Sequence, residues 1–171
     1  AVNVNQTVAS SATDLEKVAV TSQSAGANFV LDMSGMTGET ELTAIDTQVT
    51  SRTSFMNVDE GAQVRMQNVD GQTLVNFKGD RSTSTDDALN LFVSDAGTAA
   101  QSALFATVDA SNTIDTSFEV AMIETGGATE SFLDMFAMEL TTLTITGTQR
   151  LNVEDTADNF QVLKSADASA L

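Results

Sequence analysis

Apolar residues recur at every second position in many short stretches of the chain. The clearest cases are the pairs Val18 and Val20, Val64 and Met66, Leu143 and Ile145, and Leu151 and Val153. Side chains of a β-strand alternate between two faces, so this period places each pair on one face. Runs such as "VDGQT" and "ETGGA" separate the stretches, and their Gly, Asn and Asp residues favour turns. We therefore predict an all-β protein of short strands.

Two stretches depart from this alternation. The segment 130–140 places Phe132, Met135, Phe136 and Leu140 at helical spacing. The segment 99–106 also suits a helical turn. We predict one or two short helices near 99–106 and 130–140, with short strands as the alternative.

Three blocks of the sequence occur twice and keep their order. They are "LEKVAVTS" at 15–22 with "FEVAMIET" at 118–125, "FVLDMSGM" at 29–36 with "SFLDMFAM" at 131–138, and "ELTAI" at 41–45 with "ELTTL" at 139–143. Ordered blocks indicate an internal repeat, with one copy at about 15–117 and a second, truncated copy at about 118–171. We predict a single all-β repeat region over residues 1–171, either a whole domain or a piece of a longer array.

A smaller tandem lies inside the first copy. The unit "NVDEGAQVRMQ" at 57–67 is followed directly by "NVDGQTLVNFK" at 68–78. Irregular repeats of short strands are typical of a β-solenoid, or β-helix-like fold, in which each coil covers the apolar row of the next. A β-sandwich is the alternative.

The composition excludes several kinds of chemistry. The chain contains no Cys and no His, which removes thiolate nucleophiles, Ser-His-Asp triads and conventional zinc sites. Its net charge of −17 argues against nucleic-acid binding, which needs clustered Lys and Arg. No apolar run is long enough for membrane insertion. The first residues show no secretion signal, so either the signal has been removed or export uses another route.

The acidic residues suggest calcium. Oxygen ligands from carboxylates in turns suit Ca²⁺, and the candidate ligands are Asp59, Glu60, Asp70, Asp80, Asp86 and Asp87. If each eleven-residue unit of the tandem forms one coil, its acids stack on one edge, where a cation would relieve their repulsion. Ordinary Asx turns on a solvated surface are the competing interpretation.

Enzymatic activity is not predicted. Any chain with 24 acidic residues brings some carboxylates near one another, and two carboxylates suffice for glycoside hydrolysis. However, there is no Trp or Tyr to stack on a sugar. A polysaccharide-active β-helix is therefore the least favoured class. We assign the methionines of the repeated blocks, Met33, Met36, Met135 and Met138, to the core.

Several strings resemble a known class of protein. "LEKVAV", "FEVAMI", "LTTLTITGTQRLNV" at 140–153 and "LKSADASAL" at 163–171 resemble the β-strand repeats of type I-secreted bacterial surface-layer proteins and related large adhesins. This resemblance implies an extracellular structural protein at the bacterial cell surface. It also implies self-association into a lattice or filament, often with Ca²⁺, and cell-surface polysaccharide as a further candidate partner. The glycine-rich GGxGxD repeats common in that class do not occur here. A virus-like tube or filament subunit is the alternative class.

Overall fold

The structure is a computed structural model that describes residues 5–13, 16–22, 25–78, 87–111, 113–115, 118–154, 160 and 162–170. The described residues form fifteen strands and no helix. The strands are β1 (Asn5–Thr13), β2 (Lys17–Thr21), β3 (Asn28–Thr37), β4 (Glu41–Ile45), β5 (Arg52–Val58), β6 (Gln63–Gln67), β7 (Gln72–Phe77), β8 (Ala88–Ser94), β9 (Ala103–Val108), β10 (Ile114–Asp115), β11 (Val120–Gly126), β12 (Ser131–Phe136), β13 (Thr142–Gly147), β14 (Leu151–Glu154) and β15 (Ser165–Ala170). The protein is therefore all-β, as the alternation predicts.

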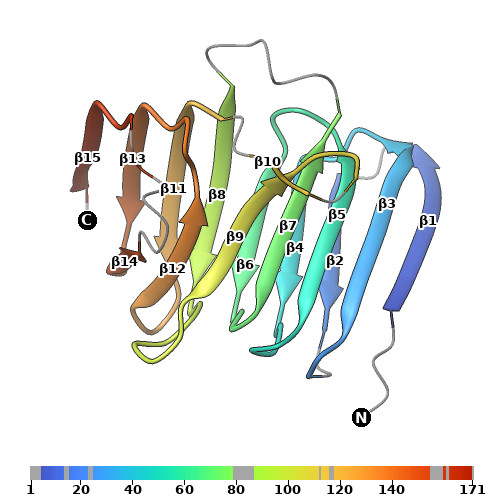
Figure 1. The fold of residues 1–171 in the computed structure, drawn as a ribbon, viewed down its shortest axis with the longest axis horizontal. Coiled ribbons are helices and arrows are strands. Elements are labelled where there is room, and N and C mark those ends of the chain that lie inside the picture. The colour runs from blue at the N-terminus through green and yellow to red at the C-terminus, as the bar shows by residue number, and fades with distance from the viewer. Residues whose placement is uncertain are drawn as a thin grey trace.

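The strands form two facing sheets, and the chain passes back and forth between them (Figure 1). Sheet A has the order β1-β3-β5-β7-β9-β12-β14, with β10 added beside β9, and sheet B has the order β15-β13-β11-β8-β6-β4-β2. Pairing is parallel throughout except between β9 and β10. The arrows of the two sheets point in opposite directions in Figure 1. We call one strand of sheet A followed by one strand of sheet B a circuit.

Neighbouring circuits stay in register although their lengths differ. Lys17 lies beside Glu41, which is 24 residues further along the chain, whereas Arg52 and Gln72 are only 20 residues apart. The connections absorb the difference in length, since loops tolerate insertions better than strands do. One outward row of sheet B therefore runs across all seven strands: Lys17, Glu41, Gln63, Asn90, Met122, Thr144 and Asp167.

The core lies between the sheets. Inward side chains of both sheets are fully buried there, with Phe55 and Phe105 from sheet A and Met66 and Ile123 from sheet B among the largest. This is the packing that the period-2 pattern predicts, because alternate residues of every strand face the opposite sheet. A second, smaller cluster of Leu74, Ala106 and Val108 lies outside this core.

The two predicted helices are wrong. Segment 130–140 contains β12 followed by a turn, and β9 begins at Ala103 within the segment 99–106. Sheet A carries apolar residues on both faces: Leu133 and Met135 are buried in the core, whereas Phe136 packs beside the smaller cluster. Apolar residues on both faces of a strand mimic helical spacing, and this explains the error.

The repeated blocks occupy matching positions. In the first copy, the Glu16 carbonyl accepts hydrogen bonds from Thr40 N, just before β4, at 2.8 Å and from Glu41 N, the first residue of β4, at 3.0 Å. The carbonyl of Glu119 does the same in the second copy, with Thr141 N, just before β13, at 2.8 Å and Thr142 N, the first residue of β13, at 3.0 Å. Leu31 and Leu133 are both buried, as are Met33 and Met135.

Two details of the repeat differ from the sequence alignment. The sequence blocks equate Val18 with Ala121 and Leu42 with Leu140. In the structure Val18 pairs with Leu42, but Ala121 pairs with Leu143. Met138 is 47% exposed, so its assignment to the core is wrong, whereas Met36 is buried. Met138 follows the end of β12 and lies in a turn, where no opposing sheet covers it.

The tandem unit also has a structural meaning. Asn57 and Asn68, the first residues of its two copies, adopt the left-handed conformation with φ of 59° and 54°. The next residues, Val58 and Val69, are fully buried. Asn tolerates positive φ better than most residues. Asn57 lies at an irregularity near the end of β5, where Val58 still pairs with Phe77, and Asn68 directly follows β6. Each unit then contains one further strand, β6 in the first and β7 in the second. One eleven-residue unit is therefore half a circuit.

Candidate functional site

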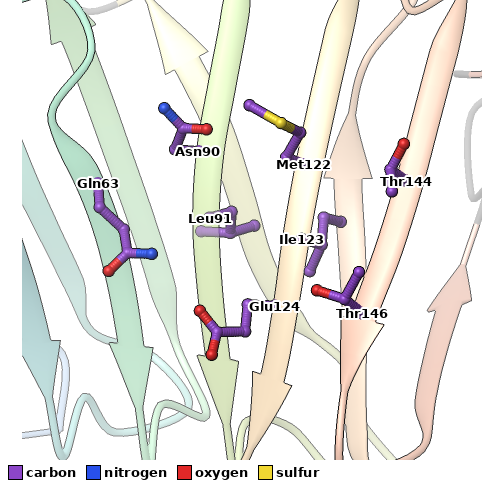
Figure 2. A pocket seen from close by; sticks show the side chains of 8 residues that line it. All are labelled: Gln63, Asn90, Leu91, Met122, Ile123, Glu124, Thr144 and Thr146. Carbon is purple, nitrogen blue, oxygen red and sulfur yellow. The ribbon is translucent and has the colours of Figure 1, made fainter. Parts of the chain in front are cut away.

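The outer face of sheet B carries a shallow groove of 380 Å³ over β6, β8, β11 and β13. Its lining consists of Gln63, Asn90, Leu91, Met122, Ile123, Glu124, Thr144 and Thr146 (Figure 2). Leu91 and Ile123 are buried in the core, so they contribute the floor of the groove. The other six residues stand on alternate positions and point outward.

Most of the residues that line the groove are uncharged and polar, whereas the surface that they expose to it is mainly apolar. Met122 is 47% exposed, and Asn90 lies beside it in the same row. The hydroxyls of Thr144 and Thr146 come from β13, and Glu124 supplies the one carboxylate among the lining residues. Two amides, two hydroxyls and a carboxylate can hydrogen-bond a polyol, whereas an anion would meet the Glu124 carboxylate. The groove therefore suits a neutral, hydroxyl-rich ligand.

The same face is charged toward the first strands. Lys17 Nζ lies 3.2 Å from Glu41 Oε2, and Arg65 Nη1 lies 3.7 Å from the same oxygen. Arg65 also donates a 3.1 Å hydrogen bond to Gln63 Oε1 and stacks its guanidinium 3.8 Å from the centre of the Phe92 ring. These contacts hold the side chains in place across the strands, as cross-strand pairs do in other sheets.

Asp59, a predicted calcium ligand, is engaged in an ion pair. Lys78 Nζ donates to Asp59 Oδ1 at 2.6 Å, to Glu39 Oε1 at 3.5 Å and to the Met36 carbonyl at 3.0 Å. The hydrogen bond from Lys78 holds the pKa of Asp59 below its usual range and raises the pKa of Lys78. The Glu39 side chain is fully buried, and its Oε2 has no hydrogen-bond partner. An ammonium group thus occupies the position beside these carboxylates that a bound cation would take.

The acids of the two tandem units were predicted to stack on one edge, but those of the first unit lie on the opposite edge from that of the second. Asp59 and Glu60 follow β5, where the chain leaves sheet A, whereas Asp70 follows β6, where it leaves sheet B. The physical reason is that the tandem unit spans half a circuit rather than a whole one. Asp59 and Asp70 therefore cannot hold the same ion.

The remaining candidates are only partly described. Asp80 and Asp86 lie outside the described residues. Asp87 precedes β8 and donates its backbone N–H to Glu119 Oε2 at 2.9 Å. Burial raises the pKa of Glu119, and the nearby Asp87 and Glu139 carboxylates raise it further. Within the described ranges, no group of three or more acidic residues is arranged to hold a metal ion.

Asp95 is an important polar residue that the sequence analysis did not single out. Its Oδ1 accepts hydrogen bonds from Ala128 N at 2.8 Å, Thr129 N at 2.7 Å and Thr129 Oγ1 at 2.8 Å. The bonds from Thr129 hold the pKa of Asp95 below its usual range. Asp95 lies in the turn after β8 and adopts a φ of 51°. Its hydrogen bonds join this turn to the turn after β11. The string "SDAGT" predicts a turn at Asp95. Its partner Thr129 is 34 residues further along the chain, so the sequence does not show that the two residues meet.

Comparison with known proteins adds no relative. No protein-family model, no curated protein and no solved structure matches the chain. Among the described residues, no helix has the length and apolar character that a membrane crossing needs.

Proposed function

We propose that the chain is a β-solenoid that serves as a structural, non-enzymatic protein of the bacterial cell surface, outside the cell. Its parallel pairing supports a solenoid over a β-sandwich, because sandwiches are built of antiparallel sheets. Strand-to-strand steps run from 20 residues, between Arg52 and Gln72, to 32 residues, between Asn90 and Met122, and lie within the size range of solenoid repeats. The resemblance to repeats of surface-layer proteins and adhesins supports the location.

The proposed activity is self-association into a lattice or filament. The observation that carries it is the pair of continuous parallel ladders, which run from the first to the last strand of each sheet and stop at open edges. No described strand pairs with the outer edges of β1, β2, β14 and β15. Such edges bind other chains readily unless something covers them. No nucleic-acid partner and no membrane insertion form part of the proposal.

Calcium assistance is a separate part of the proposal. Copies with a net charge of −17 repel each other, and cations reduce this repulsion whether they bind at a site or only screen the charge. Ca²⁺ can also bridge exposed carboxylates such as Glu60 and Glu124 on neighbouring copies. Glu60 is the member of the predicted calcium set that best suits this role, because the Asp59 carboxylate beside it is held by Lys78.

The test is sedimentation velocity and electron microscopy of the purified chain over a range of concentrations. Samples in CaCl₂, MgCl₂ and NaCl at matched ionic strength, each with and without EDTA, separate specific calcium binding from screening. Calcium assistance predicts larger particles in CaCl₂ that EDTA disperses. A monomer at every concentration and in every salt would contradict self-association, and equal behaviour in all three salts would contradict the calcium part alone.

A second candidate is attachment to neutral cell-surface polysaccharide through the groove over β6, β8, β11 and β13. The amide and hydroxyl groups of the groove support it. Titration with dextran as the probe tests it: Thr144→Val and Thr146→Val should weaken binding, whereas Thr142→Val, on the same strand but outside the groove, should not. Equal loss for all three variants would contradict binding at the groove. The virus-like tube subunit remains the alternative class, and it predicts closed rings without calcium.

A further inference from the structure

The ion pair between Lys78 and Asp59 joins two neighbouring strands of sheet A. Asp59 follows the end of β5, and Lys78 follows the end of β7, which pairs in parallel with β5. The backbone N–H of Lys78 donates to the Val58 carbonyl at 2.7 Å, so both side chains leave the ladder at the same level. Lys78 Nζ lies 2.6 Å from Asp59 Oδ1. The fold therefore holds an amine and a carboxyl group in direct contact.

Three further groups surround this pair. The side chain of Glu39 is fully buried, its Oε1 lies 3.5 Å from Lys78 Nζ, and its carboxyl group lies beside that of Asp59. Among the described residues, Glu39 Oε2 has no hydrogen-bond partner. Gly38 N donates to the second oxygen of Asp59, Oδ2, at 3.1 Å. The Met36 carbonyl accepts a 3.0 Å hydrogen bond from Lys78 Nζ and fixes its position.

These groups lie where the formation of an amide between the two side chains requires them. An amine becomes a nucleophile when a base removes its proton, and the Glu39 carboxylate touches the amine of Lys78. The tetrahedral intermediate develops an oxyanion, and the Gly38 N–H already faces Asp59 Oδ2. Well-oriented neighbouring groups react with effective molarities of about 10⁵–10⁸ M, and this advantage favours condensation over hydrolysis.

We propose that Lys78 and Asp59 form an isopeptide bond within the folded chain, with Glu39 as the proton carrier. Lys78 Nζ passes a proton to Glu39, and its lone pair attacks Asp59 Cγ. The Nζ–Cγ bond forms and the Cγ–Oδ1 bond breaks. Oδ1 leaves as water with two of the three ammonium protons, one of them delivered by Glu39, and the third proton stays on the amide nitrogen. An ammonium and a carboxylate thus become one neutral amide and one water, without any further reactant.

The ion pair is the resting state from which the bond forms. The hydrogen bond between the two side chains lowers the pKa of Asp59 and raises the pKa of Lys78, so both groups are charged before the reaction. An ammonium has no lone pair and a carboxylate is a weak electrophile, so the reaction is slow and depends on the proton carrier. The side chains of Lys78 and Asp59 are 31% and 33% exposed, which gives the released water a path to solvent.

The bond would connect two neighbouring circuits covalently in a chain that has no cysteine for a disulfide. It closes a loop from residue 59 to residue 78 that contains β6 and β7. Like a disulfide, such a link restricts the unfolded chain and raises the melting temperature.

Mass spectrometry of the purified, folded chain tests the bond. The protein should be lighter than its sequence mass by one water. Trypsin should release residues 53–65 joined to residues 66–81, because it no longer cleaves after an acylated Lys78. Lys78→Arg keeps the positive charge but has no reactive amine, and Glu39→Gln removes the proton carrier. Both variants should keep their full mass, and circular dichroism checks that they are folded. A water lost at the same rate in Glu39→Gln would overturn the role of Glu39.

Two controls separate this bond from other changes. Asp70-Gly71 can also lose water by forming a succinimide, but that loss would persist in Lys78→Arg and would join no peptides. Lys17→Arg makes the same substitution in the exposed pair with Glu41, and this variant should still lose water as the original chain does. The bond is overturned if the folded original chain keeps its full mass after prolonged incubation. It is equally overturned if Lys78→Arg loses the same water and no joined peptide appears.

Discussion

The middle and the ends of this molecule are built from the same alternation but are in different physical situations. In the middle, Phe55, Phe105 and Met135 are fully buried between the sheets. At the ends, Val18 and Leu151 occupy equivalent inward positions and remain partly exposed. The difference shows that burial in this fold depends on having a circuit on both sides, and much less on the residue itself. Stability should therefore rise from the ends toward the middle.

Cavity formation gives the largest expected contrast. Phe105→Ala removes a fully buried ring and should lower the free energy of unfolding by about 3–5 kcal/mol. Leu151→Ala removes a side chain that is only partly buried in the last circuits, and its cost should stay near 1 kcal/mol. Urea unfolding followed by circular dichroism measures both. Similar losses at the two positions would show that the ends are covered as well as the middle.

The two lysine ion pairs provide the next contrast. Lys78→Met leaves the fully buried Glu39 carboxylate without its cation and should cost about 3 kcal/mol. Lys17→Met removes a lysine that is 68% exposed, and its pair with Glu41 should contribute at most about 0.5 kcal/mol. Thermal unfolding at low and high salt measures both losses. Salt should reduce the contribution of Lys17 and leave that of Lys78 nearly unchanged.

Asp95 tests the turns of the middle circuits. Asp95→Ala removes the acceptor of three hydrogen bonds from the turn at Ala128 and Thr129 and should cost about 1–3 kcal/mol. The pKa of Asp95 is lowered on folding, so its contribution is present above its ordinary pKa of 3.8 and is lost as pH falls through the folded value. The variant should therefore lose less stability on acidification than the original chain. Equal acid sensitivity would contradict this role.

Glu119 should show the smallest effect, with the opposite sign. Burial raises its pKa in the folded chain, so the charged form destabilises the fold above that pKa, and stability from this group increases as pH falls toward the ordinary value of 4.5. Glu119→Gln keeps an acceptor for the Asp87 N–H and should stabilise the protein at pH 7 by less than about 1 kcal/mol. Thermal unfolding at pH 7 and pH 4 measures it, and destabilisation at pH 7 would contradict the expectation.

The sequence predicted the strands well where only one face of a strand is apolar. Val64 and Met66, or Leu143 and Ile145, alternate cleanly with polar neighbours, and each pair lies in a strand. The prediction failed at 130–140 because the outer face of sheet A carries its own apolar cluster, which alternation alone does not reveal. Which face a residue uses depends on the strands beside it, and these come from distant parts of the chain.

The candidate site was less predictable. The tandem at 57–78 correctly marks a recurring structure, but its length does not show whether one unit is a whole circuit or half of one. Because one unit is half a circuit, Asp59 follows a strand of sheet A and Asp70 follows a strand of sheet B, so the two residues lie on opposite edges of the molecule. The groove combines residues from four strands, and only the register between strands, which alternation does not specify, brings Gln63, Asn90 and Thr144 into one row.

The direction of the strands also determines how the molecule would respond to a pulling force. The first strand, β1, and the last strand, β15, lie at opposite ends of the long axis, and the strands run across that axis (Figure 1). A load applied between the ends would act along the backbone hydrogen bonds and break them a few at a time, instead of shearing a whole ladder at once. Successive circuits, such as those that Asp46 and Asn68 link over 22 residues, would open one after another. A circuit of 22 residues would lengthen the chain by about 75 Å and a longer circuit by more, so the extension trace should show low steps of unequal length.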